Sequence, residues 1–269
     1  MSLFQNSVQD WATKTDELEH LSTEDLVEWA LNTFQSRVAL ASSFQAEESV
    51  LIDVMYRLKG SNFCVFTLDT GRLNQETYDC MDALKERYGI KIEVFFPEAE
   101  KVEKMVKQYG PNLFYKSIEL RKTCCGVRKV EPLNRALREL DAWMTGLRRE
   151  QAATRAHVRK VEIDQDHGNI VKLNPLADWT QKQVWDYISA HGVPYNKLHD
   201  QGFPSIGCAP CTRAIKPWED IRAGRWWWEN PESKECGLHV RSEAGVGQHL
   251  QYGGISLRPA YSARTPSKR

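Results

Sequence analysis

The stretch RVALASSF, at residues 37 to 44, is a short apolar run that ends in small polar side chains. Two runs of the same kind follow it, NFCVFTLDT at 62 to 70 and IKIEVFFP at 90 to 97. Runs rich in Val, Ile and Phe favour β-strands. The stretches between them, Glu47 to Lys59 and Asn74 to Tyr88, have the pattern of helices, with Asn74 as an N-cap. This alternation predicts parallel strands joined by crossover helices.

The second half of the chain continues the pattern, after a helical segment over residues 1 to 36 and the three strands above. We expect, in order, a helix from about Arg128 to Glu139, the strand AWMTGLR at 142 to 148, two strands within 157 to 175 that meet at the turn His167-Gly168-Asn169, and a helix at 180 to 192 closed by Gly192. The predicted fold is α/β, with a mostly parallel central sheet and helices on both faces.

The composition is that of a globular protein, because 41% of the 269 residues are hydrophobic and 27% are charged. No stretch approaches the ~18 apolar residues of a membrane span, and the start MSLFQNSVQDW has no signal-peptide pattern. We therefore expect a cytoplasmic protein that contacts no membrane and keeps its seven cysteines reduced. An odd number of cysteines argues against a purely disulfide framework and favours metal binding or catalysis.

Net charge is zero, with 36 basic and 36 acidic residues, which argues against a nucleic-acid binder. The charge is uneven, however. Between Lys116 and Lys160 there are twelve Lys or Arg against five Asp or Glu. A solvated helix face accounts for part of this excess, and a small anionic ligand would account for the rest.

Three polar loops follow predicted strands: SSFQAEES at 42 to 49, LDTGR at 68 to 72 and TGLRREQAATR at 145 to 155. In an open α/β sheet, ligands bind beyond the carboxyl ends of the strands. The first loop also begins a helix, so its hydroxyls and free amide hydrogens could hold an anion. Any one loop is weak support, since strand ends often have Ser, Gly and Asp, but together the three predict a nucleotide site.

Four cysteines form two pairs, Cys124 with Cys125 and Cys208 with Cys211. Adjacent Cα atoms lie ~3.8 Å apart, below the ~4.4 Å at which ordinary disulfide geometry begins, so the first pair is not a bridge. Four thiolates suit zinc or an iron-sulfur cluster. Because neighbouring thiolates strain a single tetrahedral ion, whereas each can take its own iron in a cubane, we favour the cluster over zinc.

A further cysteine, Cys236, lies in the polar segment ESKECGLH, with Lys234 and His239 close by in sequence. Basic neighbours lower the pKa of a thiol and produce a reactive thiolate. Cys236 is thus a candidate nucleophile, although a structural role is the alternative. Cys64, in an apolar strand, and Cys80, in a helix, are expected to pack in the core.

The motifs CCGVRKVEPL, GCAPCTR, GRWWWE and KECGLH, behind LDTGR and with TGLRREQ among them, resemble the assimilatory adenylylsulfate (APS) reductases of bacteria. The resemblance extends from about residue 37 to 239. It implies a sheet related to the ATP-pyrophosphatase (adenine nucleotide alpha hydrolase-like) fold. Family members that use the 3′-phosphorylated substrate (PAPS) generally lack the two cysteine pairs, so the pairs imply APS as substrate and one four-iron four-sulfur (4Fe-4S) cluster per subunit.

The resemblance also implies the roles of individual residues. Cys124, Cys125, Cys208 and Cys211 would ligate the cluster, and Cys236 would be the catalytic nucleophile. Substrate would be bound by Lys129, Arg222, Arg225 and His239 around the phosphosulfate, by Arg148 and Arg155 in the nucleotide-side loop, by the backbones of Leu68 and Gly146, and by Ser42 and Ser43. The loop SSFQAEES lacks the glycine-rich SGGxDS turn of related pyrophosphatases, so the apparatus for cleaving ATP is missing.

The resemblance divides the chain into an N-terminal helical segment at 1 to 36, an APS-binding iron-sulfur domain at 37 to 215, a segment with the catalytic cysteine at 216 to 240, and a mobile tail at 241 to 269. We expect Cys236 to attack the APS sulfonyl sulfur, release AMP and form an S-sulfocysteine. A separate thioredoxin would then release sulfite. The family often forms homo-oligomers, so we expect one here.

Two other classes of protein share part of this pattern. A sulfur-inserting tRNA enzyme would combine a similar sheet with a cluster, but it needs ATP cleavage and a basic nucleic-acid surface, against which the missing glycine-rich loop and the neutral net charge argue. A zinc-stabilised binding module would explain the two cysteine pairs but not the ECGLH motif.

Overall fold

The structure is a computed structural model that describes residues 8–230, 251–252 and 255–256. Six of its strands form one sheet in the order β3-β2-β1-β4-β6-β5. Their bounds are β1 Val38–Ala41, β2 Cys64–Leu68, β3 Ile92–Phe95, β4 Ala142–Met144, β5 Val161–Asp164 and β6 Ile170–Leu173. All neighbours pair in parallel except β5 and β6, which form an antiparallel hairpin. The predicted mostly parallel sheet is confirmed.

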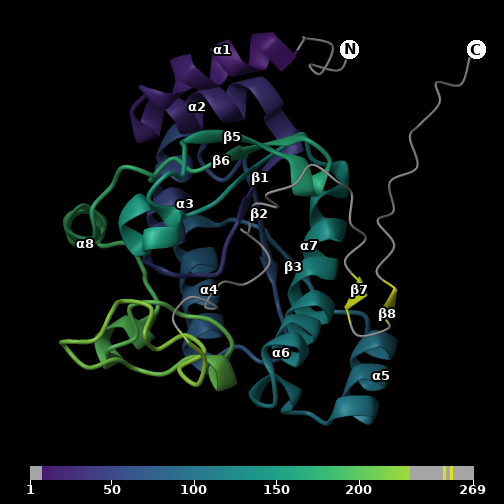
Figure 1. Ribbon diagram of the computed structural model, residues 1–269. Helices are drawn as coiled ribbons and strands as arrows, with labels where there is room; N and C mark the ends of the chain where they lie inside the picture. Colours follow the sequence, from purple (N-terminus) through teal and green to yellow (C-terminus); the bar gives the residue numbers. More distant parts are fainter. Residues whose placement is uncertain (1–7, 231–250, 253–254, 257–269) are drawn as a thin grey trace, which may run out of the picture.

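The described helices cover both faces of this sheet (Figure 1). They are α1 Val8–Glu19, α2 Thr23–Phe34, α3 Ala46–Lys59, α4 Gln75–Tyr88, α5 Ala99–Tyr109, α6 Ile118–Cys125, α7 Glu131–Ala136 and α8 Gln181–His191. A separate pair of short strands, β7 Gln251–Tyr252 and β8 Ile255–Ser256, lies near α5 in the view of Figure 1. Within the described ranges, every helix is too short or too polar to cross a membrane.

The two faces of the sheet belong to two separate cores because side chains alternate along a strand. Val38 and Leu40 of β1 join a large core with residues of α2 and α3. Ala39, between them, joins a second core with Trp143 of β4 and Leu133 of α7. The central sheet is therefore covered on both faces by packed apolar side chains.

Helices α1 and α2 form a layer beside the hairpin end of the sheet (Figure 1). Ser22 begins α2 as its N-cap, since its side chain accepts a hydrogen bond of 3.1 Å from the backbone N–H of Asp25. Leu18 and Leu26 are buried in the large core. The described part of the expected N-terminal segment, from Val8 onward, is thus packed onto the sheet through apolar contacts.

Several predicted element bounds differ from the structure. The helix expected from Arg128 begins already at Ile118, capped by the side chain of Ser117, and passes through a π-helical turn at Gly126–Val130 before α7. A turn of this width suits Pro132, which has no N–H to donate to the carbonyl four residues earlier. The strand expected at 142–148 ends at Met144.

The core position predicted for Cys64 is wrong, because this residue is exposed, whereas Cys80 is buried as predicted. Cys64 is the first residue of β2, where the strand emerges from a surface loop, and burial begins only at the next residue. The apolar residues around Cys64 in the sequence therefore do not indicate how exposed Cys64 itself is.

Candidate nucleotide and cysteine site

A cavity lies where β1, β2 and β4 end, at the carboxyl edge of the sheet. Its wall is built from the loops after these three strands, from the helix that follows the paired cysteines and from a segment near the end of the described chain. All the substrate-binding residues predicted within the described chain line it: Ser42, Ser43, Leu68, Lys129, Gly146, Arg148, Arg155, Arg222 and Arg225. His239 and Cys236 lie outside the described residues.

The loop after β1 makes a tight turn without glycine. Phe44 adopts a left-handed backbone conformation, with φ of 56°, although it is a bulky residue and is buried. Such a conformation is costly for a residue other than glycine and persists only where its surroundings enforce it. Burial of the Phe44 ring in the large core provides that enforcement.

The amide hydrogens of this loop are not all free, which corrects the expectation from sequence. The backbone N–H of Gln45 donates to Glu48 Oε2 over 3.1 Å, and that of Phe44 donates to Ser42 Oγ over 3.2 Å. The Gln45 and Glu48 side chains form a capping box at the start of α3. An anion at this helix terminus would therefore compete with a carboxylate that is already in place.

Glu47 and Glu48 form an acidic end of the cavity. Burial, and to a lesser extent the neighbouring Glu47 charge, raises the pKa of Glu48 from 4.5 to about 7. Gly146 packs directly against the pair, since a Cβ on this residue would lie 2.7 Å from Glu48 Oε1. Only glycine fits here, so the backbone of the loop after β4 can approach α3 closely.

The loop after β4 is tied to this acidic end. Arg148 is almost fully buried, and its Nε donates to Glu47 Oε1 over 2.9 Å. Gln151 donates from Nε2 to the same oxygen over 2.9 Å and accepts from Arg155 Nη1 over 2.5 Å. Arg148 is neutralised by Glu47 and shapes the wall, and its role in binding substrate stays a prediction.

The other end of the cavity is basic. Lys129 comes from the π-helical turn, and Arg222 and Arg225 come from the loop that follows the second cysteine pair. Arg225 Nη1 donates to the carbonyl of Ile206 over 2.8 Å, but its buried Nε has no hydrogen-bond partner among the described residues. A buried N–H donor without a partner is costly, and an anionic ligand would satisfy it.

The four paired cysteines share a second, smaller cavity. It is lined by Cys124 and Cys125 at the end of α6, by Cys208 and Cys211, and by the cations Arg72, Arg121, Arg128 and Lys129. Lys129 lines both cavities. In the described part of the chain, no three His, Cys, Asp or Glu side chains are placed to hold a single metal ion. The two cysteine pairs, which are far apart in the sequence, nevertheless meet at one cavity.

Two of these thiols, Cys124 and Cys211, are poorly suited to act as nucleophiles by themselves. Burial raises the pKa of Cys124 and raises that of Cys211 to about 12. A bound metal reverses this, because it deprotonates a coordinating thiol outright.

The loop LDTGR serves both cavities. Leu68 lines the first, whereas the Thr70 hydroxyl lies 3.2 Å from Cys208 Sγ and the Thr70 carbonyl accepts from Arg128 Nη1 over 2.6 Å. The backbone N–H of Ala209 donates to the carbonyl of Arg72 over 2.8 Å. This loop was expected to contact nucleotide only, and its part in holding the cysteines was missed.

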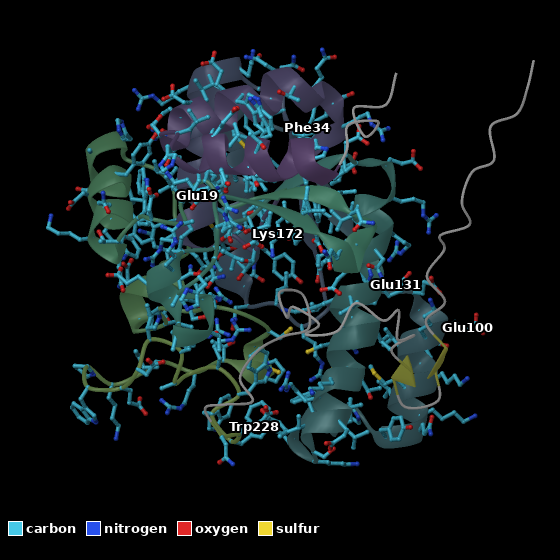
Figure 2. All side chains as sticks on the ribbon, turned by 45° about the horizontal axis from the view of Figure 1, so that its top comes forward. Glu19, Phe34, Glu100, Glu131, Lys172 and Trp228 are labelled. Carbon is cyan, nitrogen blue, oxygen red and sulfur yellow. The ribbon has the colours of Figure 1, made fainter. Side chains whose placement is uncertain are left out.

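The end of the continuous described range 8–230 is anchored beside the cysteines. Trp226 is buried against Cys124 and Cys211, while Trp227 is exposed, so the three tryptophans divide between core and surface as their sequence requires. Arg121 lies over the Trp226 ring and donates through two nitrogens to Glu229, over 2.8 and 2.9 Å. Trp228, labelled in Figure 2, packs against the same cluster.

Sequence reasoning missed the buried acids Glu47 and Glu48. The sequence places both acids in the first turn of a predicted helix. Acids at this position are normally exposed and complement the helix dipole, so the pattern does not indicate their burial. It also missed Arg121, whose burial depends on Glu229, more than a hundred residues away.

Comparison with known proteins gives consistent results. A family described as "Phosphoadenosine phosphosulfate reductase domain" matches residues 37–214. A protein of Burkholderia cepacia named adenosine 5'-phosphosulfate reductase is 51% identical over 81% of this chain and 86% of its own. A protein of the same name from Allochromatium vinosum is also 51% identical, over 77% of this chain and 80% of its own.

Solved structures extend the comparison to the fold. A phosphoadenylyl-sulfate reductase from Candida auris superposes with a TM-score of 0.66 at 27% identity, covering 80% of this chain and all of that one. An FMN adenylyltransferase from Candida glabrata has a TM-score of 0.51 at 13% identity, over 87% of this chain and 81% of that one, which indicates a shared fold alone. The predicted α/β fold is thereby confirmed, and the adenylyltransferase shares it.

Proposed function

The chain belongs to the phosphoadenosine phosphosulfate reductase domain family, and from that premise we propose that it reduces APS to sulfite and AMP, in assimilatory sulfate reduction and cysteine biosynthesis. The observation that supports this most is the position of Lys129, which lines both the nucleotide cavity and the cavity of the four cysteines. The names of the relatives at 51% identity support APS as the substrate.

The cavity suits a ligand with one anionic end. Adenosine would lie toward the loops after β1, β2 and β4, where the backbones of Leu68 and Gly146 line the wall. The phosphosulfate would lie toward Lys129, Arg222 and Arg225 and would accept from the Nε of Arg225. Charge-assisted hydrogen bonds of this kind both hold the substrate and stabilise negative charge as AMP leaves.

The proposed first step is nucleophilic. The thiolate of Cys236 attacks the sulfur of the APS sulfonyl group, a bond forms between the two sulfurs, and the bond from that sulfur to the phosphate oxygen breaks with its electron pair on AMP. Cys236 follows Asn230 by six residues, a tether of at most about 22 Å. Glu229, held by Arg121, fixes the start of that tether beside the cysteine cavity.

The second step needs two electrons, which we propose come from a separate thioredoxin. One thiolate of its dithiol attacks Cys236 and displaces sulfite, and its second thiol resolves the mixed disulfide, so that thioredoxin leaves oxidised and Cys236 returns as a thiol. We also propose a cytoplasmic location, where dithiol reductants keep such thiols reduced.

The residues present fit a 4Fe-4S cluster as cofactor, held by Cys124, Cys125, Cys208 and Cys211. Four thiols converge on one cavity, and four cations in its wall would offset the negative charge of a thiolate-ligated cluster. When bound, the cluster would supply charge and fix the paired cysteines, and it would transfer no electrons. Lys129, four residues after Cys125, would thereby be oriented toward the phosphosulfate.

The test is sulfite release from APS by the purified protein with reduced thioredoxin, compared with PAPS and with ATP. We expect sulfite and AMP in equal amounts from APS. Without thioredoxin, the protein should gain the mass of one sulfonate group on the peptide containing ECGLH. Cys236→Ser should abolish this adduct, whereas Cys64→Ser, which replaces an exposed thiol on β2, should leave it unchanged. Turnover of PAPS in preference to APS, or an adduct on Cys64, would refute the proposal.

A further inference from the structure

Glu19, at the end of α1, accepts hydrogen bonds from the segment that follows β4. Its Oε1 accepts from Arg149 Nη2 over 2.5 Å, and its Oε2 accepts from the backbone N–H of Lys160 over 2.9 Å. Arg159 Nε lies 3.5 Å from the same Oε2. One carboxylate therefore joins both ends of the segment 149–160, which includes the cavity residues Gln151 and Arg155.

The residue that Glu19 contacts, Arg149, is the backbone neighbour of a residue that lines the nucleotide cavity. Arg149 is adjacent to Arg148, and the two side chains make opposite contacts: Arg148 pairs with Glu47 at the cavity wall, whereas Arg149 pairs with Glu19 on the outer side. Arg149 Nε also donates to the carbonyl of Val158 over 2.8 Å, which closes the loop on itself. The loop is thus held between an inner and an outer ion pair.

The outer ion pair, between Glu19 and Arg149, is partly buried. The side chain of Glu19 is 20% exposed, and that of Arg149 is 36% exposed. An ion pair at a fully exposed position contributes little, but a partly buried one that also accepts a backbone N–H is stronger and more directional. Glu19, the last residue of α1, is labelled in Figure 2.

We propose that Glu19 is a positioning residue for nucleotide binding, acting through Arg149 to hold the loop that contains Arg148, Gln151 and Arg155. Glu19 lies outside residues 37–214, which match the family, so α1 adds a brace from beyond the matched region. The inference rests on the proposed function only for the identity of the nucleotide. Its prediction is that loss of the Glu19 charge weakens nucleotide binding while the chemical step is retained.

The chain offers a matched control in Asp16, one turn earlier on α1. Asp16 Oδ1 accepts from Arg159 Nη2 over 2.6 Å, so it also ties α1 to the same region, but its ion pair is with Arg159 and not with Arg149, and its side chain is 73% exposed. Glu19→Gln and Asp16→Asn therefore remove one charge each from the same helix. Only Glu19→Gln weakens the contact with Arg149, in the loop that contains Arg148, Gln151 and Arg155.

The experiment measures AMP affinity by calorimetry, together with KM and kcat for APS and the melting temperature, for the wild type and both variants. Glu19→Gln should weaken AMP binding about three- to tenfold and raise the KM for APS by a similar factor, with kcat nearly unchanged. Asp16→Asn should change AMP affinity less than about twofold, as expected for an exposed pair. A charge-swapped pair, Glu19→Arg with Arg149→Glu, should recover part of the affinity lost by Arg149→Glu alone.

Equal AMP affinity in wild type and Glu19→Gln would overturn the proposal. Equal weakening by Asp16→Asn would also overturn it, because it would indicate a general loosening of α1. So would a fall in kcat with KM unchanged. If the wild type binds AMP but does not reduce APS, the proposed function fails while the AMP measurements still decide the role of Glu19.

Discussion

Replacing Glu48 by Gln should change the pH dependence of stability. The pKa of Glu48 is raised from 4.5 to about 7, chiefly by burial and then by the charge of Glu47. Between these two pH values the folded protein keeps a proton that the unfolded chain has lost, so stability falls as pH rises from the lower value to the higher. The substitution Glu48→Gln would keep a hydrogen-bond acceptor in the capping box and remove the titration.

The magnitude follows from the two pKa values. At roughly 1.4 kcal/mol per pKa unit, the full effect is about 3 kcal/mol, of which about 2 kcal/mol falls between about pH 5.5 and pH 8.5. For a domain of this size class, about 2 kcal/mol corresponds to a change of about 4–8 °C in melting temperature. We therefore expect Glu48→Gln to gain about 4–8 °C relative to the wild type on going from the lower to the higher pH.

The assay is a thermal melt of the wild type and Glu48→Gln at both pH values. The difference in melting temperature between the two proteins at each pH removes the contribution of titrating groups that they share. Glu100→Gln is the control, because Glu100 is also in the first turn of a helix, α5, but is exposed. AMP affinity should follow the same course, since ionised Glu48 adds negative charge to the cavity. A melting gap that is independent of pH, or that narrows as pH rises, would refute the reasoning.

Three further predictions concern the two cavities. Gly146→Ala should weaken AMP binding about tenfold, because the new Cβ would lie 2.7 Å from Glu48 Oε1. Adding Glu48→Ala to this variant should restore part of the lost affinity. Undiminished AMP affinity in Gly146→Ala alone would contradict the prediction. Lys129→Ala should strongly lower APS turnover at near-normal iron content, and wild-type turnover would remove Lys129 from the site. Cys211→Ala should lose iron and the broad visible absorption expected of a 4Fe-4S cluster, whereas Cys80→Ala should keep both; a colourless wild type with one zinc per chain would exclude the cluster.

Much of the fold could be predicted because its determinants are local. The runs that became β1, β2 and β3 differ from the helices between them in composition and period, and Gly192 ends α8 in a left-handed conformation as expected. The start of α6 could not be predicted as easily, because a π-helical turn interrupts the helical period just before Pro132. The exposure of Cys64 depends on where β2 enters the sheet, which its composition does not encode.

The candidate site divides in a similar way. Residues with distinctive spacing, such as the cysteine pairs, could be identified from the sequence, and the structure brings the four together in one cavity. Charges that act through tertiary partners could not. Arg148 and Arg149 are adjacent and chemically identical, yet one pairs with Glu47 inside and the other with Glu19 outside, and only the folded chain distinguishes them.

The two ends of the nucleotide cavity differ in charge, and this asymmetry would orient the nucleotide that we propose as its ligand. At the α3 end, the carboxylates of Glu47 and Glu48 occupy the helix terminus, and the nearby Arg148 is neutralised by Glu47. At the other end, Lys129, Arg222 and Arg225 line the wall, and Arg225 keeps a buried N–H without a partner among the described residues. A nucleotide with its negative charge at one end matches this arrangement better in one orientation, because the reverse would place its anionic groups beside Glu47, which already pairs with Arg148, and beside Glu48. For the proposed substrate, the orientation that matches would place the phosphosulfate next to Lys129, which also lines the cysteine cavity.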